Sequence, residues 1–222
     1  MKKLLTEWRK FLAEGTDPRI QKQINMLLAL PKGIGIVGDS EDSFGMSFKY
    51  AEFHENGYDT LGDDGNDEGI PYGSVDIMET ESDAEGPCFG GFTVIGSSAA
   101  KGWGPLLYEV AIEWASQEGG GLTADRFSVS DNAQAVWDKY GKRGDVKGNQ
   151  MDVSHNPEGA GARLNKTVPQ LTPDDESDDC DQARAISKHG PDWHKDPTTR
   201  MYKKDNAEVM QALKAAGRLF IA

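Results

Sequence analysis

The stretch Gly91-Phe-Thr-Val-Ile-Gly-Ser-Ser-Ala-Ala-Lys-Gly-Trp-Gly104, followed by Pro105-Leu-Leu-Tyr-Glu-Val-Ala-Ile-Glu-Trp-Ala115, contains the signals that decide the fold. Phe92 to Ile95 is apolar and rich in β-forming residues, which predicts a short strand. Residues 100–104 then form a glycine-containing turn. Pro105 suits the start of a helix because its ring fixes φ and its missing N–H needs no partner there. The apolar residues that follow repeat at helical spacing until the glycines at 119–121.

A strand, a glycine turn and a helix start together favour an anion site. The first N–H groups of a helix have no partner inside it, and the helix dipole is positive at that end. The candidate donors are the backbone N–H groups of Ala100, Lys101, Gly102, Trp103 and Gly104. The alternative is a plain strand-to-helix connection in which the glycines serve only steric needs.

Two motifs in this region resemble a known family. Val94-Ile95 with Ala99-Ala100-Lys101-Gly102-Trp103-Gly104 resembles the acetyl-coenzyme A signature of GNAT-type N-acetyltransferases. Asn132-x-x-Ala135-x-Trp137-x-x-Tyr140 resembles the later helix of the same family, and the two motifs occur in the family's order. Together they cover about a quarter of the chain. Ala99 stands where the family has Gln or Arg, and Trp137 stands near the family's usual tyrosine.

The resemblance implies a fold and a set of roles. The fold is an α/β (α+β) domain with a mixed, mostly antiparallel sheet flanked by helices, and with additional N- and C-terminal helices. Acetyl-CoA would bind at the turn, with the N–H of Val94 or Ile95 polarising the thioester carbonyl. Asn132 would hold the pantetheine arm, and Tyr140 would protonate the leaving thiolate. An acid on residues 72–81, or an ordered water chain, would accept the proton of the amine. The candidates are Asp76, Glu79 and Glu81, of which Glu79 is chosen.

The implied activity is acetyl-CoA-dependent N-acyl transfer to an amine carried by a small molecule or a protein. The departures at Ala99 and Trp137 favour a second hypothesis, a catalytically degenerate binding or structural module. Apolar helical patterns at residues 4–12 and 17–31 allow a protein partner to dock on a terminal helix. The opening residues also resemble those of proteins encoded by large tailed phages. A phage-encoded factor acting on a host protein is therefore a third hypothesis.

Composition divides the chain into three parts. Residues 1–31 are expected to form a helical extension, residues 32–156 the acyl-coenzyme A domain, and residues 157–222 a polar acidic segment with a final helix. Strands are expected at 33–38, 44–53, 72–79 and 88–95, and the final helix at 206–216 is expected to pack on the core. The match of residues 33–38 to GxGxxG is rejected as a dinucleotide site, because no strand precedes it and no helix follows it.

Charge and cysteine content limit the partners. A net charge of −13 argues against nucleic-acid binding and disfavours an anionic membrane surface. Two cysteines with no CxxC pattern indicate a reducing, cytoplasmic setting, and a single disulfide between them is the alternative. No metal is expected, because Cys180, His189 and His194 lack a known ligand spacing. The acidic residues of 56–69 do not fit a twelve-residue calcium loop.

Overall fold

The computed structural model describes residues 25, 29–41, 45–61, 72–80, 85–155 and 162–222. The strands are β1 (Ile34–Glu41), β2 (Gly45–His54), β3 (Gly57–Thr60), β4 (Gly73–Glu79), β5 (Phe92–Ala99), β6 (Leu122–Thr123), β7 (Lys147–Gln150), β8 (Asp152–Val153), β9 (Asp179–Cys180), β10 (Arg200–Lys203) and β11 (Leu219–Ile221). The α-helices are α4 (Gly104–Glu118), α5 (Asp131–Tyr140), α6 (Ala162–Asn165), α7 (Ala183–His189) and α8 (Glu208–Ala215). Short 3₁₀ helices are η2 (Cys88–Gly90), η3 (Glu176–Asp178), η4 (Gly190–Lys195) and η5 (Pro197–Thr199).

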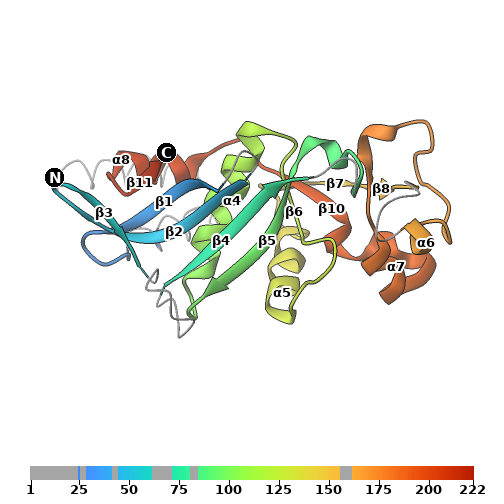
Figure 1. Cartoon of the computed structure of the whole chain (residues 1–222), viewed down its shortest axis with the longest axis horizontal. Coiled ribbons are helices and arrows are strands. Elements are labelled where there is room, and N and C mark those ends of the chain that lie inside the picture. Colours follow the sequence, from blue (N-terminus) through green and yellow to red (C-terminus); the bar gives the residue numbers. More distant parts are fainter. Residues whose placement is uncertain (1–24, 26–28, 42–44, 62–71, 81–84, 156–161) are drawn as a thin grey trace.

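A large sheet runs through the body of the molecule (Figure 1). Within the described residues it has nine strands, ordered β11-β1-β2-β4-β5-β6-β10-β7, with β3 paired to β2. The β1–β11 and β5–β6 pairs are parallel, and the other neighbours are antiparallel. The expected fold class, a mixed and mostly antiparallel sheet flanked by helices, is confirmed.

Alternating side chains fix the register of the central strands. On β2, Met46, Phe48 and Tyr50 point into the main core, as their spacing in the sequence predicts. On β4, Val75 and Ile77 point the same way. Because a one-residue slip would turn every one of these side chains to the opposite face, burial on one face specifies the pairing.

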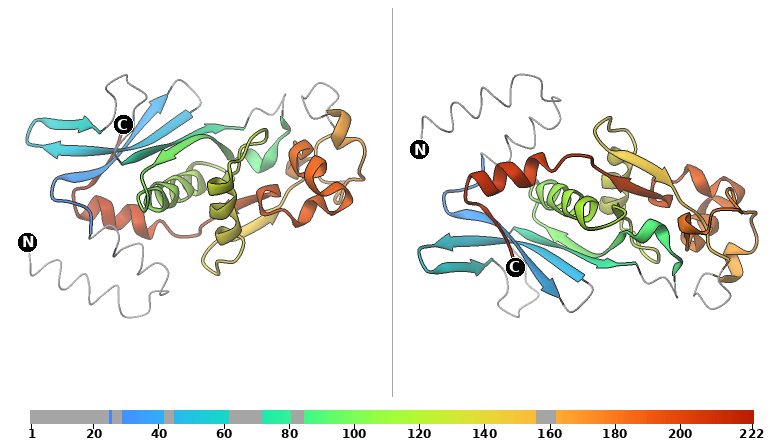
Figure 2. Two further views of the ribbon diagram at one scale, coloured as in Figure 1. Left: turned by 90° about the horizontal axis from the view of Figure 1, so that it is seen from below. Right: turned by 90° about the horizontal axis from the view of Figure 1, so that it is seen from above.

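Helices α4 and α8 both lie on one side of the sheet (Figure 2). α4 is buried along most of its length because the sheet covers one side of it and α8 packs on another. Trp114 joins it to the sheet by edge-on contacts with Phe48 and Phe92, at ring-centroid distances of 5.9 and 4.9 Å. The predicted final helix is α8, and β11 then returns to the sheet beside β1.

A buried ion cluster joins α4 to α8. Lys204 lies between Glu109 and Glu113, with its Nζ 3.1 Å from Glu109 Oε2 and 2.5 Å from Glu113 Oε1. Glu113 also accepts hydrogen bonds from the N–H groups of Val209 and Met210 at 3.2 and 2.7 Å. α8 has no capping side chain of its own, so a carboxylate from another helix satisfies its first N–H groups.

Residues 151–155 and 162–199 form a separate lobe, which we call the C-terminal lobe (Figure 1, right). It contains the small β8–β9 sheet, the helices α6 and α7 and three short 3₁₀ helices. Its ends are adjacent, because β7 pairs with β10 and the Met151 N–H donates to the Thr199 carbonyl at 3.2 Å. Much of this region, predicted only as a polar acidic segment, is organised around its own packed residues.

Cys88 and Cys180 form a disulfide that ties η2 to β9. The expectation of reduced cysteines is therefore wrong for this structure, and the single-disulfide alternative holds. Cys88 and its neighbours were expected to begin a strand, but they form η2, and β5 begins at Phe92. Positive φ angles at Cys88 and Phe89 explain the difference, because an extended strand cannot contain them.

No strand is predicted at residues 57–60, yet they form β3 as the second arm of a hairpin with β2. The helical extension at 1–31 falls almost wholly outside the described residues, as do the acids at 62–71 and Glu81.

Candidate functional site

The predicted glycine turn lies between β5 and α4 and is exposed. Ala100, Lys101 and Gly102 are all exposed, and Gly102 has a φ of 94° with open space where a Cβ would stand. Within the described part of the chain, the N–H groups of Lys101 and Gly102 donate to no protein acceptor. They lie just before the N-terminus of a 15-residue helix, where the dipole favours a negative charge.

Trp103 has a different role from the one predicted. Its N–H donates to the Ala100 carbonyl at 3.0 Å, which closes the turn, so this N–H is not offered to a ligand. Its ring packs edge-on against Tyr50 and Tyr72 at 5.1 and 4.4 Å, and its carbonyl accepts a hydrogen bond from the Tyr50 hydroxyl at 2.8 Å. Trp103 therefore anchors the turn to β2.

β5 carries an irregularity at one of the two predicted oxyanion donors. Val94 pairs with Ile77 and Gly96 with Asp76, so Ile95 has no partner position on β4. Val94 is buried, whereas Ile95 is 50% exposed. The extra residue of a β-bulge is left out of the ladder, and bulges are common beside functional sites.

The other edge of β5 is covered only at its start. β6 pairs in parallel with Phe92 and Thr93, and then ends. A parallel ladder in this register directs the Val94 N–H toward the Thr123 carbonyl. From Ile95 to Ala99, no other described strand pairs with this edge. Of the two predicted oxyanion donors, Val94 therefore lies at the end of the β6 ladder and Ile95 lies at the bulge.

Helix α5 carries two of the predicted residues, Asn132 and Tyr140, at its opposite ends. Ser130 caps the helix by accepting from the Ala133 N–H at 3.2 Å, and Asn132 lies exposed in the first turn. Tyr140 is 4% exposed, packs edge-on against Trp137 and at a tilt against Tyr202, and has the Arg143 guanidinium 5.1 Å from its ring centre.

The hydroxyl of Tyr140 faces the buried ion cluster of α4. Burial, followed by the charge of Glu109, raises the pKa of Tyr140 well above 10. Arg143 pairs with Glu109 and with Asp145 in the same cluster. Among the described residues, no hydrogen bond or ring contact joins Tyr140 to β5 or to the turn, and its electrostatic neighbours are Glu109, Arg143 and Tyr108.

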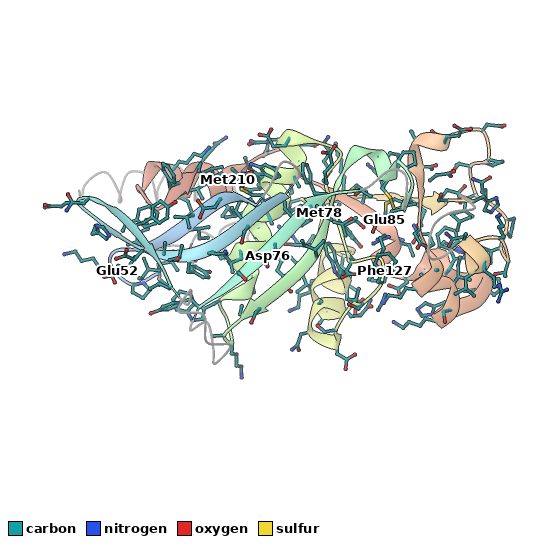
Figure 3. All side chains as sticks on the ribbon, viewed as in Figure 1. Glu52, Asp76, Met78, Glu85, Phe127 and Met210 are labelled. Carbon is teal, nitrogen blue, oxygen red and sulfur yellow. A yellow bond between two sulfur atoms is a disulfide. The ribbon has the colours of Figure 1, made fainter. Side chains whose placement is uncertain are left out.

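Of the two described acids on β4, Asp76 lies beside the bulge and Glu79 lies at the far end of the strand. Glu79 is exposed at the end of the strand, opposite Phe92. Asp76 pairs with Gly96, and a Cβ added to Gly96 would lie 3.0 Å from Asp76 Oδ2. Figure 3 shows Asp76 on the sheet, where alternation with the buried Val75 turns it to the face opposite α4. Ser47 donates to this carboxylate at 2.5 Å.

Sequence reasoning missed a hydroxyl pair at Ser97, in the part of β5 that β6 does not cover. Tyr108 of α4 donates to Ser97 Oγ at 3.0 Å. Burial raises the pKa of Tyr108 above 10, although its bond to Ser97 opposes the shift. The sequence gives no signal for this pair, because Tyr108 sits among apolar residues at helical spacing.

An open pocket of about 370 Å³ lies between the loop after β6 and the C-terminal lobe, and no residue of the turn lines it. Phe127, labelled in Figure 3, stands at its side and is 62% exposed. Arg126 in its wall donates to the carbonyls of Ala124 and Thr198 at 2.7 Å. The Arg126 guanidinium therefore uses its N–H groups to hold the loop after β6 to the C-terminal lobe.

No family model matches the chain, and no curated protein and no solved structure does either. No helix in the described ranges is long and apolar enough to cross a membrane.

Proposed function

We propose that the protein is an acetyl-CoA-dependent N-acyltransferase in which an amine attacks the thioester directly. The observation that carries the proposal is the exposed turn at 100–103. It joins a strand with a bulge and an uncovered edge to the N-terminus of a long buried helix. This arrangement supplies donors for a diphosphate and, along β5, an edge for an extended arm.

The geometry refines the roles that the sequence indicates. The N–H groups of Lys101 and Gly102, with the α4 N-terminus at Gly104, bind the diphosphate. The pantetheine arm runs along β5 past Ser97, and the Ile95 N–H polarises the thioester carbonyl. Asn132 of α5 contacts the same arm.

At the carbonyl carbon, the chemical step forms one bond and breaks one, and two proton transfers complete it. The amine nitrogen bonds to the carbonyl carbon, the carbon–sulfur bond breaks, and the amine loses a proton. Asp76 is better placed than Glu79 to accept that proton, because it lies beside Gly96, next to the bulge. The thiolate leaves with a proton from solvent, since Tyr140 faces the buried cluster.

Calorimetric titration of the full chain with acetyl-CoA tests the coenzyme site. Gly102→Ala should weaken binding about tenfold, because it places a methyl in the open space of the turn and strains a backbone with positive φ. Gly217→Ala is the matched control. It has a φ of 65° and equally open space, but it lies after α8, so it should leave the affinity unchanged. No heat at millimolar acetyl-CoA would defeat the proposal.

The second candidate is a coenzyme-binding module without acyl transfer. The position of Tyr140 favours it, because a buried hydroxyl beside Glu109 and Arg143 contributes to packing. Mass spectrometry after incubation with acetyl-CoA and a panel of diamines and lysine peptides separates the two. Binding without any acetylated product would support the module.

A further inference from the structure

Three carboxylates converge in the C-terminal lobe. Asp152 belongs to β8, Asp178 ends η3 and Asp179 begins β9. One oxygen from each lies within 4.8 Å of the others. The parallel pairing of β8 with β9 places Asp152 opposite Asp179, so the strand register itself brings two of the acids together.

These carboxylates are buried or half-buried. Asp152 is 1% exposed and Asp178 is 6% exposed. The turn at 170–172 supplies most of their hydrogen bonds: Asp152 accepts from the Leu171 and Thr172 N–H groups at 2.8 and 2.7 Å, and Asp179 accepts from Gln170 at 3.0 Å. Neutral donors satisfy individual oxygens, but they leave the three negative charges facing one another.

One atom of the group has no partner. Asp178 Oδ2 accepts from the Thr172 hydroxyl at 2.8 Å, whereas Asp178 Oδ1 is buried and has no hydrogen bond. Among the described residues, no lysine or arginine forms an ion pair with Asp152, Asp178 or Asp179. A buried carboxylate oxygen with neither a donor nor a counter-charge is costly unless a ligand supplies them.

We propose that Asp152, Asp178 and Asp179 bind one divalent cation, and that Ca²⁺ fits best. Carboxylate oxygens are the ligands of hard cations, and Ca²⁺ holds them at about 2.3–2.6 Å. Two oxygens on opposite sides of one Ca²⁺ are therefore roughly 5 Å apart, which matches the spread of the three acids. The smaller Mg²⁺ requires tighter octahedral geometry, and the acids would have to move closer together.

The cation has a structural consequence. It joins β8, η3 and β9, the three elements that carry the acids. Cys180 follows Asp179 directly and is bonded to Cys88, just before β5. Bound Ca²⁺ thus stabilises the part of the lobe that is attached to the start of β5. This proposal does not depend on acyl transfer.

Calorimetry and thermal unfolding of the EDTA-treated full chain with CaCl2, and separately with MgCl2, test the site. One equivalent of Ca²⁺ should bind, and at a hundredfold excess over Kd it should raise Tm by about 5 °C. Asp178→Asn should abolish both effects while leaving Tm in EDTA unchanged or higher, since it removes one of three facing charges.

Asp174→Asn is the matched control, because it removes an exposed acid of the same turn region that lies outside the group. It should keep the full response to Ca²⁺. Asp179→Asn provides a second variant should Asp178→Asn fail to fold. No response to 5 mM CaCl2 in the unmodified chain, or an equal response in Asp178→Asn, would overturn the proposal. A response to MgCl2 alone would overturn the choice of Ca²⁺.

Discussion

The sheet body and the C-terminal lobe are held together by different forces. The body encloses one continuous apolar core shared by the sheet, α4 and α8. The lobe has a cluster of five buried apolar residues: Val153, Val168, Ala185, Ile186 and Trp193. Its other constraints are hydrogen-bonded carboxylates and a disulfide. A region too small to bury a large core needs cross-links of this kind, so the two regions should respond differently to the same treatment.

The body should be most sensitive at its buried ion cluster. Lys204→Met leaves the buried Glu113 without a counter-charge and Glu109 with Arg143 alone, and this should lower the free energy of unfolding by about 4 kcal/mol. Urea denaturation followed by circular dichroism measures the loss. The matched control is Lys147→Met, which removes an exposed pair with Asp205 and should cost less than about 1 kcal/mol. Equal losses in the two variants would contradict a structural role for the cluster.

The lobe should depend most on the disulfide. Replacing Cys88 and Cys180 together by alanine removes a link between positions 92 residues apart. The expected loss is about 3 kcal/mol, since the unfolded chain regains its freedom. Fluorescence of Trp193, which lies in the lobe's own apolar cluster, should then change at lower urea concentration than the helical signal of the body. A single coincident transition would show that body and lobe unfold as one unit.

A smaller effect should appear at Asp196, which accepts hydrogen bonds from the Thr198 N–H at 3.0 Å, from Gln134 at 3.2 Å and from His189 at 2.9 Å. Burial would raise the pKa of Asp196, but these hydrogen bonds outweigh burial and hold it well below its usual range. The stabilisation is therefore present above about pH 4 and is lost as the pH falls through the acid range. Asp196→Asn should cost about 2 kcal/mol at pH 7 and less at pH 3, where the carboxyl is protonated in the unfolded chain but still ionised in the folded protein.

Urea denaturation of the wild type and of Asp196→Asn, at pH 7 and at pH 3, measures how far the difference in their free energies of unfolding shrinks. Asp205→Asn, an exposed acid whose side chain is 63% accessible, controls for the change in net charge. If the free energies of unfolding of wild type and Asp196→Asn differ as much at pH 3 as at pH 7, the ionised carboxylate is not the cause of the stabilisation.

Apolar periodicity predicted the sheet body well, because its elements bury one face each. The β2 alternation, the α4 stripe and the final helix all follow from this rule. The lobe could not be predicted in the same way. Its pairing of Asp152 with Asp179 and its disulfide depend on contacts between distant positions, which leave no local pattern.

The candidate site was predictable in part. The sequence indicated the strand, the turn and the helix start in the right order, and residue types alone suffice for that. It could not show that the Trp103 N–H closes the turn, that the bulge falls at Ile95 or that Tyr140 is buried. Each of these depends on register and packing, which a local pattern does not encode.

The pairing of β7 with β10 has a wider consequence, because the chain leaves the sheet at Met151 and re-enters it opposite, at Thr199. The whole lobe is thus an insertion in a hairpin whose two arms already lie in register. Such a segment can vary in length without changing the register of the two strands that bracket it, because β7 and β10 pair on their own. The disulfide to Cys88 is what still couples such variation to the start of β5.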